Sequence, residues 1–127
     1  MSEFKIETKC IQSGYTPGNG EPRVLPICQS TTYKYDSASH LGDLFDLKAP
    51  GHMYSRISNP TVDAVEKKIA DLEGGTGAVL TSSGQAANML AILNIASAGQ
   101  NIVSMSSIYG GTINLFAVTL NDNLYKS

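Results

Sequence analysis

The sequence has no tryptophan, little cysteine and no strong excess of charge of either sign. Cys10 and Cys28 could pair, but the first residues carry no apolar leader, so two reduced thiols are expected. The formal net charge is −2 and the nine Lys and Arg residues are scattered, which excludes the basic surface that nucleic acid or an anionic membrane needs. The longest apolar-rich stretch, residues 86–98, is interrupted by polar side chains and is too short to span a bilayer. His40 and His52 stand alone, without metal-ligand spacing. These absences predict a protein of the cytoplasm with neither nucleic acid nor a membrane as its primary partner.

The sequence is 42% apolar and 16% charged, as in an ordinary globular protein. The chain divides into two parts that differ in proline content and in the periodicity of their apolar residues. Residues 1–58 contain four of the five prolines and show weak periodicity. The pattern there indicates one helix, near 38–47 after an N-cap at Ser37, and allows a short strand around 24–27. Because such an arm buries little of itself, we expect it to lie on the second half of the chain or on a neighbouring subunit.

Residues 59–127 alternate helical and strand patterns. Helices are predicted from Pro60 to about residue 73, over 85–97 and over 112–120, and β-prone runs occupy 78–81 and 101–105. The helix over 85–97 is apolar nearly all round, which predicts that it is buried. Helices that alternate with strands predict an α/β domain with a parallel sheet, but two strands are too few for a complete one. Residues 59–127 are therefore expected to be the beginning of a larger α/β domain.

A turn of small residues joins the first β-prone run to the helix that follows. Unpaired N–H groups and the helix dipole favour an anion at such a turn, and Gly84 lets the backbone approach it closely. The hydroxyls of Ser82 and Ser83 can donate hydrogen bonds as well. The segment is neither a Walker A loop nor a dinucleotide-binding fingerprint. Taken alone, it is equally well explained as a phosphate cradle or as a plain helix cap.

Two further motifs carry groups that can bind a ligand. Tyr54 and Arg56, two apart in an expected extended stretch, offer a phenol and a guanidinium to a phosphate, although a surface Arg beside a packed Tyr is the alternative. Tyr109 precedes Gly110 and Gly111, which leave one face of its ring uncrowded. A flat ligand could stack there, or the ring could pack on its own domain.

Four motifs in this order resemble the Cys/Met metabolism family of pyridoxal-phosphate (PLP) enzymes. They are Tyr-Ser-Arg-Ile-Ser-Asn-Pro-Thr at 54–61, Leu-Glu-Gly-Gly at 72–75, Ser-Ser-Gly-Gln-Ala at 82–86 and Tyr-Gly-Gly-Thr at 109–112. The resemblance runs from about Thr8 to Leu120. It implies the N-terminal part of a fold type I, aminotransferase-like α/β architecture with PLP as the cofactor.

The resemblance also implies roles for individual residues. Ser83 and the N–H groups of Gly84 and Gln85 would hold the PLP phosphate. Tyr109 would stack on the pyridine ring and act as a catalytic residue in substrate binding or proton handling. Tyr54 and Arg56 would reach the phosphate of the neighbouring subunit's cofactor. The arm of residues 1–58 would then wrap a partner in a homotetramer built as a dimer of dimers.

The motif at 110–112 and the segment 44–48 are similar to the O-acetylhomoserine sulfhydrylases of the family. The implied reaction on this amino-acid substrate replaces acetate by sulfide or methanethiol, as part of trans-sulfuration in methionine and cysteine metabolism. A methionine γ-lyase or a cystathionine γ-synthase or lyase is the alternative.

The sequence also departs from the family pattern. The family's Schiff-base lysine and the aspartate that pairs with the pyridine nitrogen follow the segment matched here. None of the seven lysines stands in the family's lysine motif, and residues 121–127 do not continue the family pattern. These departures favour a truncated product or fragment, predicted to be inactive alone. A non-catalytic remnant that acts only by self-association is the other alternative.

Overall fold

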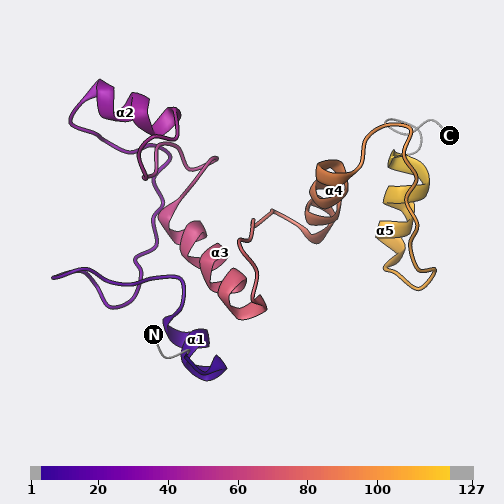
Figure 1. The fold of residues 1–127 in the computed structure, drawn as a ribbon, viewed down its shortest axis with the longest axis horizontal. Helices are drawn as coiled ribbons and strands as arrows, with labels where there is room; N and C mark the ends of the chain where they lie inside the picture. Colours follow the sequence, from indigo (N-terminus) through magenta and orange to yellow (C-terminus); the bar gives the residue numbers. More distant parts are fainter. Residues whose placement is uncertain (1–3, 121–127) are drawn as a thin grey trace. The chain divides into compact units, whose positions relative to one another are not determined.

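The computed structural model describes residues 4–120, and its secondary structure is helical. The helices are α1 (Ile6–Gln12), α2 (Ala38–Phe45), α3 (Pro60–Glu73), α4 (Gly84–Ile95), α5 (Gly110–Asn114) and a π-helical turn, η1 (Leu115–Leu120) (Figure 1). The chain divides into two units, one up to Val79 and the other from Leu80 onward. In the described part, no helix is both long enough and apolar enough to cross a membrane.

The predicted helices form, and their caps explain where they begin. The side chain of Asn59 accepts a hydrogen bond from Thr61 N at 2.9 Å, and Pro60 occupies the first helical position of α3. Ser37 caps α2 in the same way, accepting from His40 N at 3.1 Å. Helix α3 ends at Glu73 and is capped by Gly74, whose φ of 67° is the left-handed conformation that glycine adopts without strain.

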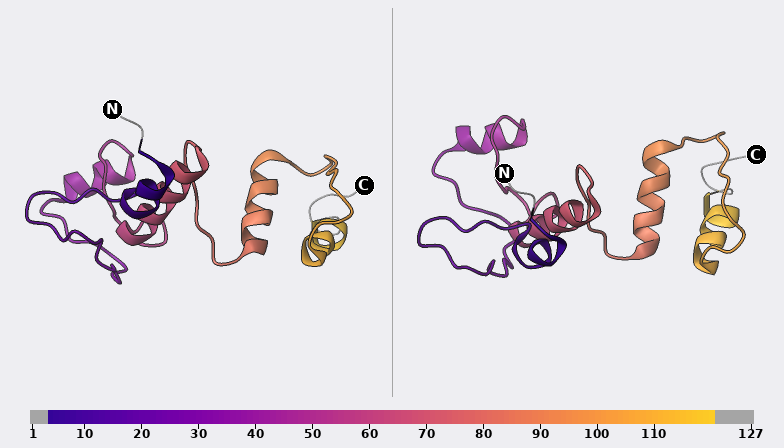
Figure 2. Two further views of the ribbon diagram at one scale, coloured as in Figure 1. Left: turned by 90° about the horizontal axis from the view of Figure 1, so that it is seen from below. Right: turned by 60° about the horizontal axis from the view of Figure 1, so that its bottom comes forward.

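Helix α1, which the sequence pattern did not predict, is held on α3 by polar contacts (Figures 1 and 2). Lys9 Nζ lies 2.8 Å from a carboxylate oxygen of Asp71, and Ser13 donates to the other oxygen of that carboxylate. The backbone then turns at Gly14, with φ of 90°. A Cβ at this position would lie 2.1 Å from the carbonyl oxygen of Ala64 in α3, so only glycine permits the close approach.

The predicted strands do not form ladders among residues 4–120. Segments 24–27, 78–81 and 101–105 carry no strand assignment, and the described β-pairing is an isolated antiparallel bridge between Thr32 and Tyr54. A strand is stabilised by hydrogen bonds to a neighbouring strand, and no other described segment forms a backbone ladder with these three. The β-prone composition therefore has no pairing partner within the described residues.

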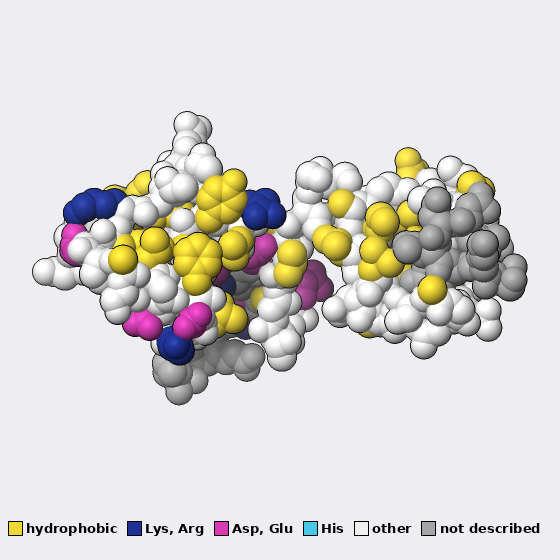
Figure 3. Space-filling model, turned by 90° about the horizontal axis from the view of Figure 1, so that it is seen from above, with side chains coloured by type: hydrophobic (Ala, Val, Ile, Leu, Met, Phe, Trp, Pro, Cys, Tyr) yellow, Lys and Arg dark blue, Asp and Glu magenta, His cyan; other side chains and the backbone are white. Residues whose placement is uncertain are grey.

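The prediction that the helix after residue 84 is buried is wrong for this chain, because no residue of α4 is buried. One face of α4, with Met89 and Ile92, packs on a small core formed by Leu115 and Leu120 of η1. The short α5–η1 segment covers only this face. Other apolar side chains of α4 stay exposed, Ile95 by 77%. Hydrophobic side chains are visible at the surface of both units (Figure 3).

Candidate functional site

At the N-terminus of α4, two backbone donors have no acceptor among the described residues. Ser83 is the N-cap, and its Oγ accepts a hydrogen bond from Ala86 N at 3.1 Å. This bond uses the third free N–H of the helix and leaves those of Gly84 and Gln85, for which residues 4–120 provide no backbone acceptor. The Ser83 hydroxyl hydrogen is still available for donation. Space is open around Gly84, where a Cβ would have no neighbour within 4 Å. The positive end of the α4 dipole adds to the attraction for an anion here.

Side-chain hydrogen bonds fasten the first turns of α4 to α5. Thr112, a buried residue of α5, donates from its Oγ1 to Gln85 Oε1 at 3.3 Å. Asn88 Nδ2 donates to Thr112 Oγ1 at 3.0 Å and lies 3.4 Å from Gln85 Oε1. The three side chains thus form a closed triangle that fixes the N-terminal end of α4 relative to α5.

The ring of Tyr109 lies next to this triangle. Tyr109 is the residue that precedes α5, and 76% of its surface is exposed. A Cβ built on Gly111 would lie 2.6 Å from Tyr109 Cε1 and 3.1 Å from Gln85 Nε2, so ring and amide flank the same empty position. The structure therefore brings together four of the predicted site residues in the second unit: Ser83, Gly84, Gln85 and Tyr109.

The remaining predicted residues, Tyr54 and Arg56, lie in the first unit. The expected extended stretch is instead a turn, in which the N–H groups of Ile57 and Ser58 both donate to Tyr54 O, at 2.8 and 3.0 Å. The turn nevertheless places the two side chains together, with Arg56 Cζ 5.5 Å from the centroid of the Tyr54 ring. Within residues 4–120 no carboxylate pairs with this guanidinium, which is exposed.

A polar network anchors that turn on the start of α3. Asn59, 8% exposed, donates from Nδ2 to Cys28 O at 3.1 Å, to Tyr33 Oη at 3.2 Å and to Ser55 Oγ at 3.0 Å. The Tyr33 hydroxyl also lies 3.5 Å from Cys28 Sγ, and this hydrogen bond, followed by one from the backbone of Ser30, lowers the pKa of the Cys28 thiol. The network holds the segment that carries Tyr54 and Arg56 in one conformation.

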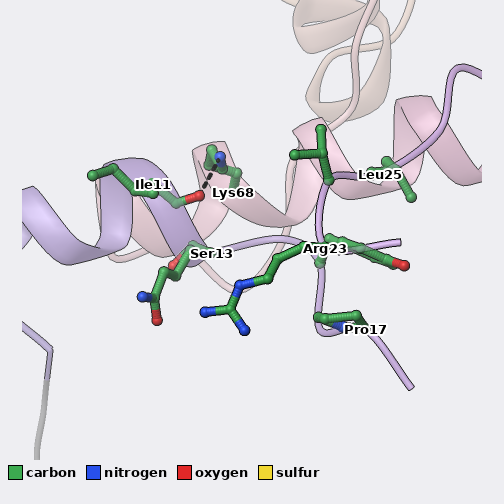
Figure 4. A pocket seen from close by; sticks show the side chains of 9 residues that line it. Ile11, Ser13, Pro17, Arg23, Leu25 and Lys68 are labelled. Atoms are coloured by element: carbon green, nitrogen blue, oxygen red, sulfur yellow. Dashed lines mark hydrogen bonds between the residues drawn. The ribbon is translucent and has the colours of Figure 1, made fainter. Parts of the chain in front are cut away.

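A separate cavity of about 420 Å³ lies between α1, the following loop and α3. Arg23 and Lys68 are among the residues that line it (Figure 4). Lys68 Nζ donates to the backbone carbonyls of Cys10 and Ile11, at 3.2 and 3.4 Å, so its charge serves the packing of α1 on α3. The described residues contain no group of three or more His, Cys, Asp or Glu side chains placed to hold a metal ion.

Sequence reasoning missed two parts of this arrangement. Asn88 gave a signal, a polar residue one helical turn after Gln85 in a mainly apolar helix. Asn59 was interpreted only as the cap of α3. Its contacts with residues far earlier in the chain have no sequence signature.

Comparison with known proteins places these residues in a family. The family model of the Cys/Met metabolism PLP-dependent enzymes matches residues 7–127, so the expectation that residues 121–127 depart from the family pattern is wrong. The chain belongs to this family.

Relatives named as O-acetyl-L-homoserine sulfhydrylases are similar to most of this chain. The chain is 49% identical over 121 residues to O-acetyl-L-homoserine sulfhydrylase 1 of Thermus thermophilus, covering 92% of the chain and 28% of that protein. It is 49% identical over 120 residues to O-acetyl-L-homoserine sulfhydrylase of Corynebacterium glutamicum, covering 94% of the chain and 28% of that protein. The chain thus spans little more than a quarter of the length of these relatives.

A solved structure confirms the predicted fold class. The crystal structure of an O-acetylhomoserine (thiol)-lyase from Campylobacter jejuni, which carries a pyridoxyl-lysine phosphate, matches with a TM-score of 0.88 and 35% identity. The match covers 94% of the chain and 30% of that structure. The chain therefore has the N-terminal part of the fold type I architecture of PLP enzymes.

The residues at the α4 N-terminus fit the phosphate and ring of PLP. Two free N–H groups, the Ser83 hydroxyl and the open space at Gly84 suit a phosphate, and the exposed ring of Tyr109 lies on the same end of the unit. The family to which the chain belongs is PLP-dependent.

Proposed function

We propose that this chain forms the N-terminal portion of a PLP-dependent O-acetylhomoserine sulfhydrylase. The α4 N-terminus binds the cofactor phosphate, and Tyr109 stacks on the cofactor ring. The observation that supports this most strongly is the pair of N–H groups at Gly84 and Gln85, which find no acceptor within residues 4–120 and lie on the end of the unit that also carries Tyr109. The relatives named as sulfhydrylases support the substrate class.

The residues of the chain contribute positioning and proton transfer. Bound PLP supplies an electron sink for charge that develops on the amino-acid substrate. The α4 N–H groups and the Ser83 hydroxyl fix the phosphate, and thereby the distance between the cofactor ring and Tyr109. The Tyr109 phenol, at the surface of the unit, can hold or move a proton at its Oη.

Tyr54 and Arg56 act on a second subunit in this proposal. The guanidinium over the phenol ring is exposed and pairs with no carboxylate of the described part of the chain, which suits a phosphate brought by a partner. The arm of residues 1–58 would then lie on a neighbouring subunit of a dimer of dimers.

Replacing Gly84 by proline tests the phosphate site. Proline removes one donor N–H but is well tolerated at the first helical position, and Ser83 already has the extended φ of −162° and ψ of 158° that a following proline requires. Gly84→Ala is the matched control, because it keeps the N–H and has open space for its Cβ.

We expect Gly84→Pro to weaken binding of PLP and of inorganic phosphate about tenfold or more, the value of a hydrogen bond to a charged group. Binding is measured by isothermal titration, and circular dichroism checks that helix content is unchanged. Equal affinities for Gly84→Pro and Gly84→Ala would show that this end of α4 does not hold the phosphate.

The 127-residue chain alone is expected to be inactive, because none of its lysines stands in the family's lysine motif. The assay combines the purified chain with O-acetylhomoserine, sulfide and PLP and measures homocysteine. Turnover above that of free PLP would contradict the expectation.

A non-catalytic role through self-association is a second candidate. It is favoured by the apolar side chains that the described residues leave exposed, among them Ile95 and Val103, which is 96% exposed. Sedimentation equilibrium separates the two: this candidate requires a stable oligomer that forms without PLP and does not bind PLP.

A further inference from the structure

Gly111 occupies a position where an added side chain would overlap the ring of Tyr109 as the structure places it. The Cβ that any other residue would add lies 2.6 Å from Tyr109 Cε1, well inside van der Waals contact. It also lies 3.1 Å from the side-chain nitrogen of Gln85. The space that a side chain at 111 would fill therefore lies between the Tyr109 ring and the Gln85 amide.

The adjacent Gly110 has no such constraint. It is the first residue of α5, and a Cβ built there has no neighbour within 4 Å. Neither glycine has a positive φ, so backbone conformation does not require glycine at either position. The two residues therefore differ in their surroundings and not in their backbone freedom.

We propose that Gly111 is a positioning residue: its missing side chain sets where the Tyr109 ring lies relative to the N-terminus of α4. The proposal rests on the proposed function, because the ring is the surface on which the PLP pyridine would stack. The Thr112–Gln85–Asn88 triangle holds one side of the gap, since Gln85 and Thr112 are hydrogen-bonded at 3.3 Å and Thr112 is buried. The ring of Tyr109, exposed to solvent, is the side that can move.

A methyl group at 111 would therefore displace the ring and leave the fold intact. The clash is with the outer edge of an exposed aromatic side chain, which can rotate away at little cost. Alanine also has a higher helix propensity than glycine, which favours α5. The expected consequence is a chain of normal stability whose aromatic surface is misplaced for a flat ligand.

The ring position is tested first, without any ligand. The full chain is labelled with 3-fluorotyrosine, and the Tyr109 resonance is assigned by its loss in Tyr109→Phe. We expect Gly111→Ala to shift this resonance and Gly110→Ala to leave it in place, with equal helix content in both. An unchanged resonance in Gly111→Ala, or an equal shift in both variants, would overturn the proposal.

Ligand binding is tested second, with PLP and with inorganic phosphate as separate probes. We expect Gly111→Ala to weaken PLP binding about 2- to 10-fold, the range of an aromatic stacking contact, and to leave phosphate binding unchanged. Gly110→Ala should bind both as the wild type does. In a Tyr109→Ala background, Gly111→Ala should have no further effect on PLP binding.

The two failures are distinguishable. If the wild-type chain binds neither PLP nor phosphate, the proposed function fails for this chain, and the fluorine spectra still decide whether Gly111 positions the ring. If it binds PLP and Gly111→Ala shifts the ring without weakening that binding, the proposed function stands and the role of Gly111 in cofactor binding is wrong.

Discussion

Replacing Asn59 by alanine should lower the free energy of unfolding of the first unit by more than the loss of a helix cap alone does. The side chain caps α3 through Thr61 N and donates to the backbone carbonyl of Cys28 and to two hydroxyls, while only 8% of it is exposed. A lost cap costs about 1 kcal/mol, and each lost amide hydrogen bond about 1 kcal/mol. Because Nδ2 carries two hydrogens, two such bonds are counted. The expected loss in the free energy of unfolding is about 3 kcal/mol.

Two control variants separate the contribution of the helix cap from that of the amide hydrogen bonds. Asn59→Ser keeps a cap acceptor and loses the amide donors, so it should cost about 2 kcal/mol. Ser37→Ala removes the exposed cap of α2 and nothing else, and should cost about 1 kcal/mol. The measurement is urea denaturation followed by far-ultraviolet circular dichroism, with amide exchange in α3 to assign the change to the first unit. If Asn59→Ala costs no more than Ser37→Ala, the network through Nδ2 contributes nothing and the reasoning is refuted.

Two further predictions concern the contact of α1 with α3. The hydrogen bond from Lys9, followed by that from Ser13, lowers the pKa of Asp71. The ionised carboxylate therefore stabilises the folded state at pH values above the pKa of an unfolded aspartate. This stabilisation is lost as the pH falls through the lowered folded pKa; amide exchange in α1 should therefore be faster in Asp71→Asn than in the wild type near neutral pH, and the difference should vanish in acid. Gly14→Ala should destabilise the chain far more than Gly20→Ala in the same urea assay. Both glycines have positive φ, which costs about 1–2 kcal/mol in alanine, but only the Cβ at 14 would collide with Ala64 O, at 2.1 Å; equal losses would show that the collision is relieved.

Local signals in the sequence predicted most of the helices. Asn59 followed by Pro60, and Ser83 followed by Gly84, begin helices within one residue of the observed bounds, because capping depends on neighbours in the chain. Helix α1 was missed because it has no side-chain cap and is stabilised by residues about 60 positions later, such as Asp71. Pairing over such a distance leaves no local pattern.

The strands and the burial of α4 were mispredicted for a different physical reason. A β-prone run such as 78–81 forms a strand only when a partner strand pairs with it. An apolar helix is buried only when other elements pack on its faces. Both patterns are properties of the segment, while pairing and burial depend on what lies beside it. The second unit provides a neighbour for one face of α4, through Leu115 and Leu120.

The site was predicted in part. The turn at Ser83–Gln85 and the ring of Tyr109 were identified from the sequence, and the structure brings them to one end of the second unit. The hydrogen-bonded triangle that fixes them could not be predicted, because Asn88 and Thr112 meet only when α4 and α5 pack together. The structure places Tyr54 and Arg56 together, through a turn and not through an extended strand, and their role at a phosphate stays a prediction.

The most direct test of the phosphate and ring site is a map of where PLP touches the chain. The ¹⁵N-labelled chain is titrated with PLP, and amide shifts are followed by heteronuclear correlation spectra. The account predicts that the largest shifts are those of Gly84, Gln85 and Tyr109, and that inorganic phosphate reproduces the first two but not the third. Shifts centred elsewhere, for example on the cavity beside Arg23, or no shifts at all, would contradict it.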